Sequence, residues 1–564
     1  MIPVFNEIVE AKTHTPIYTM HKYFARRPWN VFNELISHYS ASGEIVLDPF
    51  AGGGVTVIEA LKLKRKAIGV DVNPLAIYIT SMEVRPLDLT SFETAFLHLR
   101  TQLREEILSL YATSCEKCDG EAVADWIEWD ENRRYPIRLK YDCTKCGIAA
   151  TKAASKTDCE LATRIERDFS SLIQKRKVGF PQTRIPAGDK SNSLITNGLR
   201  FFHELFTKRN LLALSILFDA INSLEVDERE FLRFTFSSSL KWASRLSHLR
   251  GRIVEGWAMH AYWIYSKSLE MNVWNTFQRR TNAVMRGKKY SSNYIGNYCR
   301  LAREFNDIAL GDSTCLLLNT SSSKLPLPSN SVDAIITDPP YGGNVNYGEL
   351  SDFWWIWLSG GVTTEKVEEA VINRTQEKSL DEYEKILGSI FSECYRILKP
   401  ERYLVSTFNS KDIRVVASFV KAASIAGFVL HPEGLLYQKP IRSYVTTFHA
   451  MQIGSFVGDF IFTFLKSQNG ASNMRTKIDL PDLKRELDES MTERSTDEVD
   501  ETKLRIRTYR ALIPFLAANA KSNSPQCQEA LNYYEVKIRD RNRQFSQLRP
   551  KLIEKRKKKF LRET

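Results

Sequence analysis

The residues with the clearest chemical potential in this sequence are the quartet Asp338, Pro339, Pro340 and Tyr341. An aromatic amine is a poor nucleophile because its lone pair is delocalised into the ring. The Asp338 carboxylate and the Pro339 carbonyl can each accept one N–H hydrogen bond from such an amine, which frees the lone pair for in-line attack. The prolines stiffen the loop, and Tyr341 offers a face for stacking. The quartet therefore predicts a site that activates the exocyclic amine of a nucleobase.

The position of the quartet fits this chemistry. Residues 331–337 form an apolar run that predicts a strand, so the quartet follows the carboxyl end of that strand. Open α/β sheets place their ligands at this edge. Asp and Pro are also ordinary turn residues, so a plain turn after a strand is the alternative.

A second signature lies far upstream, in residues 44–60. A buried strand leads into the glycine loop 52–54 and then into a helix with apolar residues. A further strand ends at Asp71. This βαβ pattern predicts a nucleotide-binding unit in which Asp71 is placed for a ribose diol.

Two details of this unit favour a cationic ligand over a dinucleotide. Val57 replaces the third glycine of the dinucleotide-binding pattern, and Asp48 lies immediately before the loop. A carboxylate there would repel a pyrophosphate, but it suits the ammonium group of S-adenosylmethionine. The loop is therefore expected to bind that cofactor.

Together these segments resemble the amino-methyltransferases of DNA, which carry D-P-F-x-G-x-G for S-adenosylmethionine and D-P-P-Y for the target amine. Residues 338–358 and 21–28 are similar to a bacterial and archaeal family of adenine-specific methylases that contain a zinc ribbon. The resemblance spans residues 15–468 in motif order. It implies an α/β fold with the Rossmann-like, seven-stranded sheet of class I methyltransferases.

The resemblance also implies which residues bind the cofactor. Phe50 and the loop that contains Gly52 and Gly54 would form the floor of the site, and Asp48 would lie near the methionine end. Asp71 matches the acid that binds the ribose.

Two further cofactor residues rest on the resemblance alone. Asp312 matches the acid that hydrogen-bonds the cofactor adenine from the third strand. Arg27 matches a basic residue before a proline, so it would reach the cofactor carboxylate; a surface arginine is the alternative.

Four of the nine cysteines form two Cys-x-x-Cys pairs: Cys115 with Cys118, and Cys143 with Cys146. Two such pairs supply the four thiolates of a structural Zn²⁺ site, and the segments between them have the composition of short strands. The sequence therefore predicts a zinc ribbon, with a redox pair as the alternative.

The order of these segments predicts five regions. They are a cofactor half (1–92), a zinc-ribbon insertion (93–180), a helical insertion that is the candidate DNA-reading region (181–308), a substrate half (309–468) and a charged helical C-terminal region (469–564). Within the helical insertion, residues 241–252 and 278–280 mix basic and aromatic side chains that would contact DNA or form a solvated helix face. In the substrate half we expect a buried helix over 352–358 that packs on the sheet, a fifth strand over 402–408 and a final antiparallel pair over 427–430 and 458–465. The basic run 551–559 would rest on DNA or remain solvated.

Composition agrees with this interpretation. The net charge is +12 and the pI is near 9.1, which suits a polyanionic partner such as double-stranded DNA. The sequence has no run of eighteen apolar residues and no signal segment, so we expect a soluble, cytoplasmic protein without a membrane partner.

These observations predict an enzyme that transfers a methyl group from S-adenosylmethionine to the N6 amine of adenine in DNA, after the base has been flipped out of the duplex. The alternatives are methylation of cytosine N4 or of RNA, and a catalytically inactive subunit that only binds DNA within a defence complex. Partners from a restriction or defence system would be compatible with each of these functions.

Overall fold

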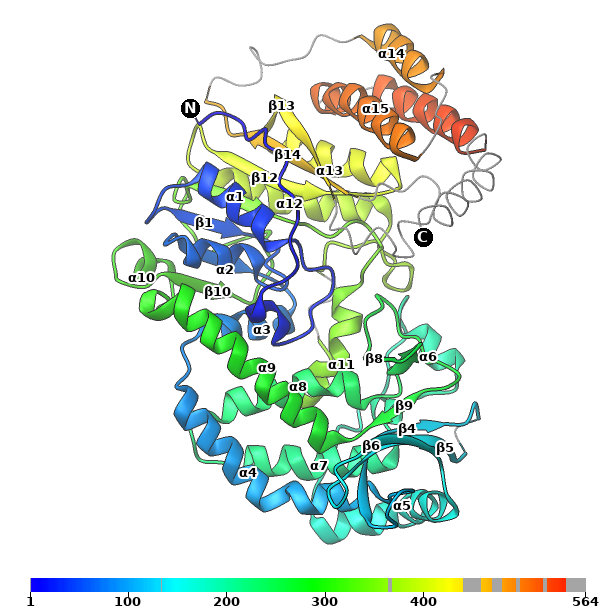
Figure 1. Ribbon diagram of the computed structural model, residues 1–564. Coiled ribbons are helices and arrows are strands. Elements are labelled where there is room, and N and C mark those ends of the chain that lie inside the picture. The colour runs from blue at the N-terminus through cyan, green and yellow to red at the C-terminus, as the bar shows by residue number, and fades with distance from the viewer. Residues whose placement is uncertain are drawn as a thin grey trace, which may run out of the picture.

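The computed structural model describes residues 2–132, 134–363, 368–439, 458–468, 479–492, 498–520 and 525–543. Figure 1 shows an elongated molecule. One half contains a large sheet with its helices, and the other half is built mainly from the insertion between residues 89 and 294.

Seven strands form the large sheet. In spatial order they are β10 (Cys315–Leu318), β2 (Lys66–Val70), β1 (Ile45–Asp48), β11 (Ala334–Thr337), β12 (Tyr403–Phe408), β14 (Asp459–Leu465) and β13 (Val429–Gln438). The first five strands are parallel, and β14 runs antiparallel to both of its neighbours. This confirms the expected α/β class with a mostly parallel sheet, and it is compatible with a class I methyltransferase.

The sheet has a topological switch point between β1 and β11. From β1 the chain continues outward to β2 on one side, whereas β11 and β12 lie on the other side. The connections at the carboxyl ends of β1 and β11 therefore diverge and leave a crevice, which is where open α/β sheets bind ligands.

Alternate residues of the central strands face two separate hydrophobic cores, because successive side chains of a strand point to opposite faces. Val46 and Ala334 face one core, and Leu47 and Ile335 face the other. The first core contains α1 (Trp29–Tyr39), α2 (Val55–Lys62) and α3 (Pro74–Val84); the second contains α12 (Leu380–Ile397) and α13 (Ile413–Ala426).

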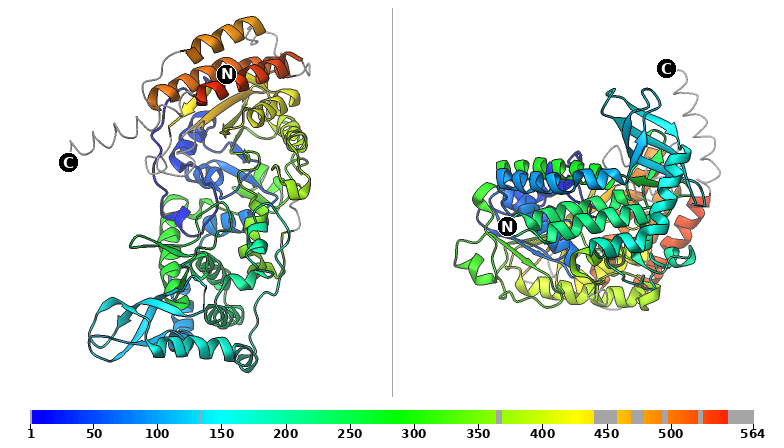
Figure 2. Two further views of the ribbon diagram at one scale, coloured as in Figure 1. Left: turned by 90° about the vertical axis from the view of Figure 1, so that its right-hand side faces the viewer. Right: turned by 90° about the horizontal axis from the view of Figure 1, so that it is seen from below.

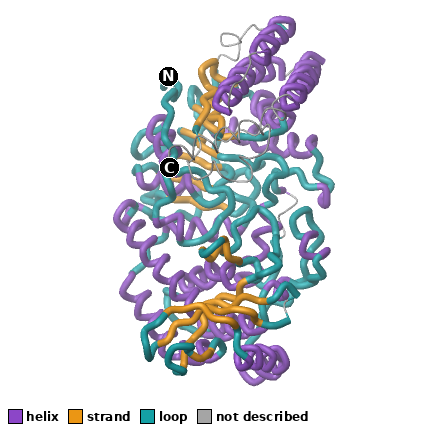
Figure 3. Tube along the Cα trace, turned by 45° about the vertical axis from the view of Figure 1, so that its right-hand side comes forward, coloured by secondary structure: helices purple, strands orange, loops and turns teal. Residues whose placement is uncertain are grey.

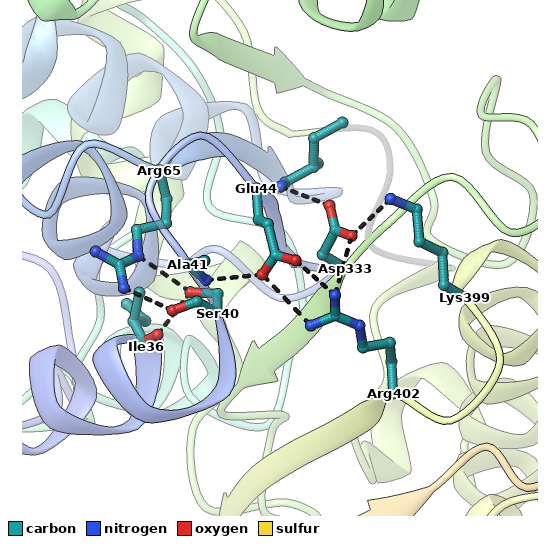
Figure 4. Close-up of polar contacts among 9 residues, drawn as sticks. Ile36, Ser40, Ala41, Glu44, Arg65, Asp333, Lys399 and Arg402 are labelled. Atoms are coloured by element: carbon teal, nitrogen blue, oxygen red, sulfur yellow. Dashed lines mark hydrogen bonds and ion pairs between the residues drawn. The ribbon is translucent and has the colours of Figure 1, made fainter. Parts of the chain in front are cut away.

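Ion pairs join neighbouring strands at the amino end of the sheet, opposite the switch point (Figure 4). Arg402 Nη2 lies 2.5 Å from Glu44 Oε1, and Lys399 Nζ lies 2.6 Å from Asp333 Oδ1. Asp333 also accepts a hydrogen bond from the amide of Ile45 at 2.9 Å. These contacts hold the register of β1, β11 and β12. Because they lie at the amino ends of the strands, they do not occupy the carboxyl edge, where the crevice lies.

The insertion contains a second sheet and a set of long helices. The sheet is formed by β3 (Ala112–Ser114), β4 (Glu121–Trp129), β5 (Pro136–Cys143), β6 (Ala149–Ala153) and β9 (Leu269–Met271). The helices are α4 (Leu89–Ser109), α5 (Lys156–Arg176), α7 (Lys208–Asn222), α8 (Arg229–Ala243) and α9 (Val273–Tyr294). Figure 2 shows the small sheet projecting beside these helices, and Figure 3 shows it well separated from the large sheet. A short hairpin of β7 (His248–Arg250) and β8 (Ile253–Glu255) lies between the two sheets.

The helix expected over 352–358 is α11 (Tyr347–Ser359), and its burial is confirmed. Its expected packing on the large sheet is wrong. It packs on α3 and α8, and Trp354 stacks on Trp257 of the insertion with ring centroids 5.2 Å apart. The aromatic residues of the insertion therefore bury this helix and fix the insertion to the substrate half.

The C-terminal region is helical where it is described. It contains α14 (Leu480–Thr492), α15 (Glu498–Asn519) and a helix over 525–543, and the side chains of Leu512 and Phe515 pack into the second core. The basic run 551–559 lies outside the described residues. Within the ranges described above, no helix is both long and apolar enough to cross a membrane.

Candidate active site

The glycine loop joins β1 to α2 and requires glycine for two reasons. Gly52 and Gly54 have φ values of +48° and +74°, which side chains disfavour. A Cβ atom at Gly53 would lie only 2.4 Å from Arg26 Nε, and one at Gly54 would lie 2.6 Å from Thr80 Oγ1. The loop is thus folded tightly against the helix side, and its backbone is open to the crevice.

Two carboxylates flank this loop, of which Asp48 is buried and Asp71 is partly buried. Asp48 Oδ1 accepts hydrogen bonds from Thr337 Oγ1 at 2.6 Å and from the Phe50 amide at 3.0 Å. Asp71 accepts from the amides of Gly52 and Asn73, both at 2.8 Å. Burial raises the pKa of Asp48 to about 7 and the pKa of Asp71 to about 6. Both groups would regain stability as carboxylates if a cation bound beside them.

The Asp338 carboxylate is oriented by hydroxyl groups from two sides. It directly follows β11, and its Oδ1 accepts hydrogen bonds from Thr407 Oγ1 at 2.6 Å and from the Tyr341 hydroxyl. The hydroxyl of Tyr383 binds the Pro340 carbonyl at 2.8 Å and fixes the loop further. These bonds leave Oδ2 as the oxygen that faces the crevice.

Arg27 forms an ion pair with this second oxygen. Its Nε lies 2.6 Å from Asp338 Oδ2, its Nη1 lies 3.0 Å from Asp459 Oδ2, and its guanidinium carbon lies 4.7 Å from the Tyr341 ring centroid. The planar guanidinium group therefore stacks on Tyr341 and donates to Asp338, which are the two interactions expected of a target base. Arg27 thus contacts the substrate half and also lines the cavity that contains the glycine loop, so its expected contact with the cofactor carboxylate stays a prediction.

One cavity joins the two halves of the site. It is lined by Asp48, Phe50, Gly52 and Asp71 from the cofactor half and by Asp338 and Pro340 from the substrate half. The sequence analysis thus identified residues that the fold brings together from segments almost three hundred positions apart.

The cavity is acidic. Besides Asp48, Asp71 and Asp338, it is lined by Glu368 and Glu369, whereas its two arginines, Arg26 and Arg27, already pair with carboxylates. Burial raises the pKa of Glu369 to about 7. A ligand with positive charge is therefore favoured.

Several lining residues were missed by the sequence analysis. Tyr23 stacks on Tyr347 with ring centroids 5.7 Å apart, and the Tyr347 amide donates to Glu369 at 2.6 Å. Tyr23 and Glu369 lie on loops and Tyr347 begins α11, none of them within a strand–loop–helix signature, so only the folded chain brings them together.

Thr407 and Asp459 were also missed, although a signal was present. Thr407 lies near the end of β12 and Asp459 begins the antiparallel β14, so both lie at the same edge of the sheet as Asp338. The polar residue at each predicted strand boundary could have identified them.

Asp312 is not part of this cavity. It is exposed and precedes β10, at the amino end of that strand. Leu318, at the other end of β10, pairs with Val70 beside the site. The next residue, Asn319, donates to the backbone carbonyl of Asp71 at 2.9 Å. We therefore assign no cofactor contact to Asp312.

The four cysteines converge at the turns of the small sheet. The sulfur atoms of Cys115, Cys118, Cys143 and Cys146 all lie within 4.8 Å of one another. The Cys115–Cys146 and Cys118–Cys143 separations are 3.6 Å, far longer than a disulfide bond. Four sulfurs bound tetrahedrally to Zn²⁺ at ~2.3 Å would lie about 3.8 Å apart, so the set fits such an ion.

The site and the fold define a Rossmann-like sheet with an acidic crevice next to a D-P-P-Y loop. A family model for N6- and N4-type enzymes, described as DNA methylase, matches residues 4–82, which include Arg27, Asp48, Gly52 and Asp71. A similar segment occurs in the Type II methyltransferase M.MjaII of Methanocaldococcus jannaschii, with 25% identity over 84 residues. That segment covers 15% of this chain and 14% of the relative. These comparisons support a DNA amino-methyltransferase, and they do not distinguish N6 from N4.

Proposed function

We propose that this protein transfers a methyl group from S-adenosylmethionine to the N6 amine of adenine in DNA. The observation that carries the proposal is the single cavity in which the glycine loop, Asp71 and Asp338 meet. A methyl donor and an amine must occupy adjacent positions for in-line transfer, and both would lie in this cavity.

The residues around the loop fit S-adenosylmethionine. The cofactor carries a sulfonium and an ammonium group, and the acidic lining favours both. Asp71 would accept hydrogen bonds from the ribose diol, and Asp48 would face the ammonium group. Phe50 and the open backbone of the glycine loop would support the body of the cofactor.

Asp338 would act as the acceptor for the target amine. Oδ1 is held by Thr407 and Tyr341, so Oδ2 and the Pro339 carbonyl would each receive one N–H of the amine. Arg27 must leave Oδ2 before this can happen. Its second contact, with Asp459, gives it a place to remain while the base stacks on Tyr341.

The cysteine cluster would hold a structural Zn²⁺. Four thiolates fill a tetrahedral shell and leave no open position for a substrate, so the ion would stabilise the small sheet rather than take part in methyl transfer.

Transfer of labelled methyl groups to duplex DNA and to RNA tests the substrate class. We expect labelling of DNA that requires Asp338. Labelling of RNA alone would favour RNA methylation, and cofactor binding without any transfer would favour an inactive DNA-binding subunit. Transfer to cytosine N4 requires the same chemistry, so only the identity of the methylated base distinguishes it from transfer to adenine N6.

The affinity for S-adenosylmethionine should rise with pH. The pKa values of Asp48 and Asp71 are raised to about 7 and about 6. Asp48 must lose its proton to face the ammonium group, and Asp71 must lose its proton to accept both hydrogen bonds of the ribose diol. We expect affinity to increase between about pH 5.5 and pH 8, by up to about tenfold per pH unit below the higher pKa. Calorimetry measures this directly, and S-adenosylhomocysteine, which keeps the ammonium group and the ribose diol, should show the same dependence on pH. Equal affinity at both ends of this range would contradict the roles of these carboxylates.

Thr407 should position Asp338 through its hydroxyl. We expect Thr407→Val to lower kcat by about tenfold, the size of one hydrogen bond to a charged group, without changing cofactor affinity. Thr407→Ser keeps the hydroxyl and should retain most activity. Single-turnover methyl transfer checks both variants, and an unchanged rate for Thr407→Val would exclude the positioning role.

A further inference from the structure

A second groove lies in the insertion, apart from the cavity described above. Its walls are the small sheet, the β7–β8 hairpin and one face of α9. In Figure 1 the hairpin lies beside α11, between the large sheet and the small one.

The register of the small sheet forms the floor of this groove. Trp126 of β4 pairs with Met271 on one side and with Lys140 on the other, and Lys140 pairs with Thr151 of β6. Residues that pair directly across neighbouring strands share one face, so this row presents its side chains together. Leu249 and Val254 of the hairpin pack against Trp126 and Met271 and close one end of the row.

The groove is strongly basic. It is lined by five cations, Arg138, Lys140, Arg252, Arg279 and Arg280, and by one carboxylate, Asp125. Asp125 pairs with Arg279, and Glu128 pairs with Arg138 at 2.8 Å. Lys140 and Arg252 make no ion pair within the described part of the chain. Cations gathered without counter-charges repel one another, so the groove is suited to a polyanion.

The basic character continues from the groove toward the segment that carries Arg27. Lys241 lies next to Trp242 of the groove wall, and burial together with the charges of Lys22 and Arg280 lowers the pKa of Lys241 to about 7. At neutral pH Lys241 is therefore only partly charged, and an anion bound beside it would favour its protonation.

The groove is also close to the catalytic carboxylate. Arg280 Nη2 donates to the carbonyls of Thr19 and Met20, both at 2.6 Å, and Arg27 lies seven residues further on at Asp338. Seven extended residues span at most ~25 Å, which is less than the ~34 Å of one turn of DNA. A duplex with its target base at Asp338 can therefore reach the groove within one helical turn.

The geometry points to this groove as the site that binds the phosphate backbone of duplex DNA beside the target base. The choice of DNA as partner rests on the proposed function, whereas the polyanion-binding character rests on the charges alone. Trp126 and Trp242 line the groove with the cations and support the sugar groups between phosphates.

The test is the salt dependence of DNA binding by the full chain. Fluorescence anisotropy of a labelled duplex of about three helical turns is measured over a range of salt concentrations. The double variant Lys140→Ala/Arg252→Ala removes two groove cations that make no ion pair within the described part of the chain, and Lys156→Ala/Lys385→Ala removes the same charge from exposed positions on α5 and α12. Calorimetry with S-adenosylmethionine shows that each variant is folded.

We expect the groove variant to bind about tenfold more weakly at physiological salt and to lose about two units from the slope of log K against log salt, while the control keeps the wild-type slope. An unchanged slope for the groove variant would overturn the inference, even if methyl transfer to DNA is found. A reduced slope without methyl transfer would support the groove as the phosphate-binding site and would reject the proposed function. Groove-dependent binding of RNA but not of duplex DNA would reject DNA as the occupant.

Discussion

Replacing Asp338 with alanine should lower the rate of methyl transfer by about a thousandfold and leave S-adenosylmethionine affinity within a few-fold of wild type. The Asp338 carboxylate would accept the amine N–H as the nitrogen lone pair becomes available. Removing the carboxylate therefore raises the free energy of the transition state and leaves cofactor binding largely unchanged. Single-turnover transfer and calorimetry on the same preparation measure the two quantities.

Matched variants separate the role of Asp338 from general damage. Asp381→Ala removes an exposed carboxylate from the first turn of α12 and should leave both quantities unchanged. Asp71→Ala should weaken S-adenosylmethionine binding more than it lowers the transfer rate of the bound complex, because the Asp71 carboxylate faces the proposed ribose site. If cofactor binding collapses in Asp338→Ala together with activity, the role assigned to Asp338 is wrong.

Freshly purified protein should contain one zinc ion per chain, held by Cys115, Cys118, Cys143 and Cys146. Structural zinc contributes folding free energy directly, so Cys143→Ser should unfold the small sheet and reduce solubility. DNA binding should suffer more than cofactor binding, because β4, β5 and β6 form the floor of the basic groove.

Elemental analysis and thermal unfolding check this prediction. Cys159→Ser is the matched control, since Cys159 lies in α5, outside the sulfur cluster. It should keep its zinc and its unfolding temperature. Protein prepared without chelators and found to be free of zinc would exclude the structural ion.

Much of the candidate site could be predicted from sequence because its chemistry follows strand ends. Asp48 and Asp71 end or follow buried apolar strands, and Asp338 follows a third. Parallel strands bring their carboxyl ends to one edge, so residues distant in sequence were expected to meet there. The antiparallel pair of β13 and β14 was predictable from its apolar composition, although β13 continues to Gln438, beyond the predicted 427–430.

The same reasoning also shows why Asp312 was misplaced. The apolar run of β10 comes after Asp312, so this acid lies at the amino edge of the sheet, whereas Asn319 follows the strand and lies at the site. The resemblance implied that an acid lies near the third strand. It did not indicate at which end of that strand the acid lies.

Other features depended on tertiary packing. The apolar composition of α11 predicts burial, but it does not identify the surface that buries it, and α8 with Trp257 does so. The sequence analysis predicted a cofactor contact for Arg27 but not its ion pairs with Asp338 and Asp459, which hold it over Tyr341. Neither partner is adjacent to Arg27 in sequence, so no local pattern could have indicated the pairing.

The most direct test of the central claim is nucleoside mass spectrometry of unmethylated genomic DNA after incubation with the protein and S-adenosylmethionine. Genomic DNA presents many sequence contexts, so the recognition sequence need not be known. The account predicts N6-methyladenine that is absent when Asp338→Ala replaces the wild-type protein. N4-methylcytosine alone would change the assigned base, whereas DNA that remains unmethylated by cofactor-bound wild-type protein would contradict amino-methylation of DNA itself.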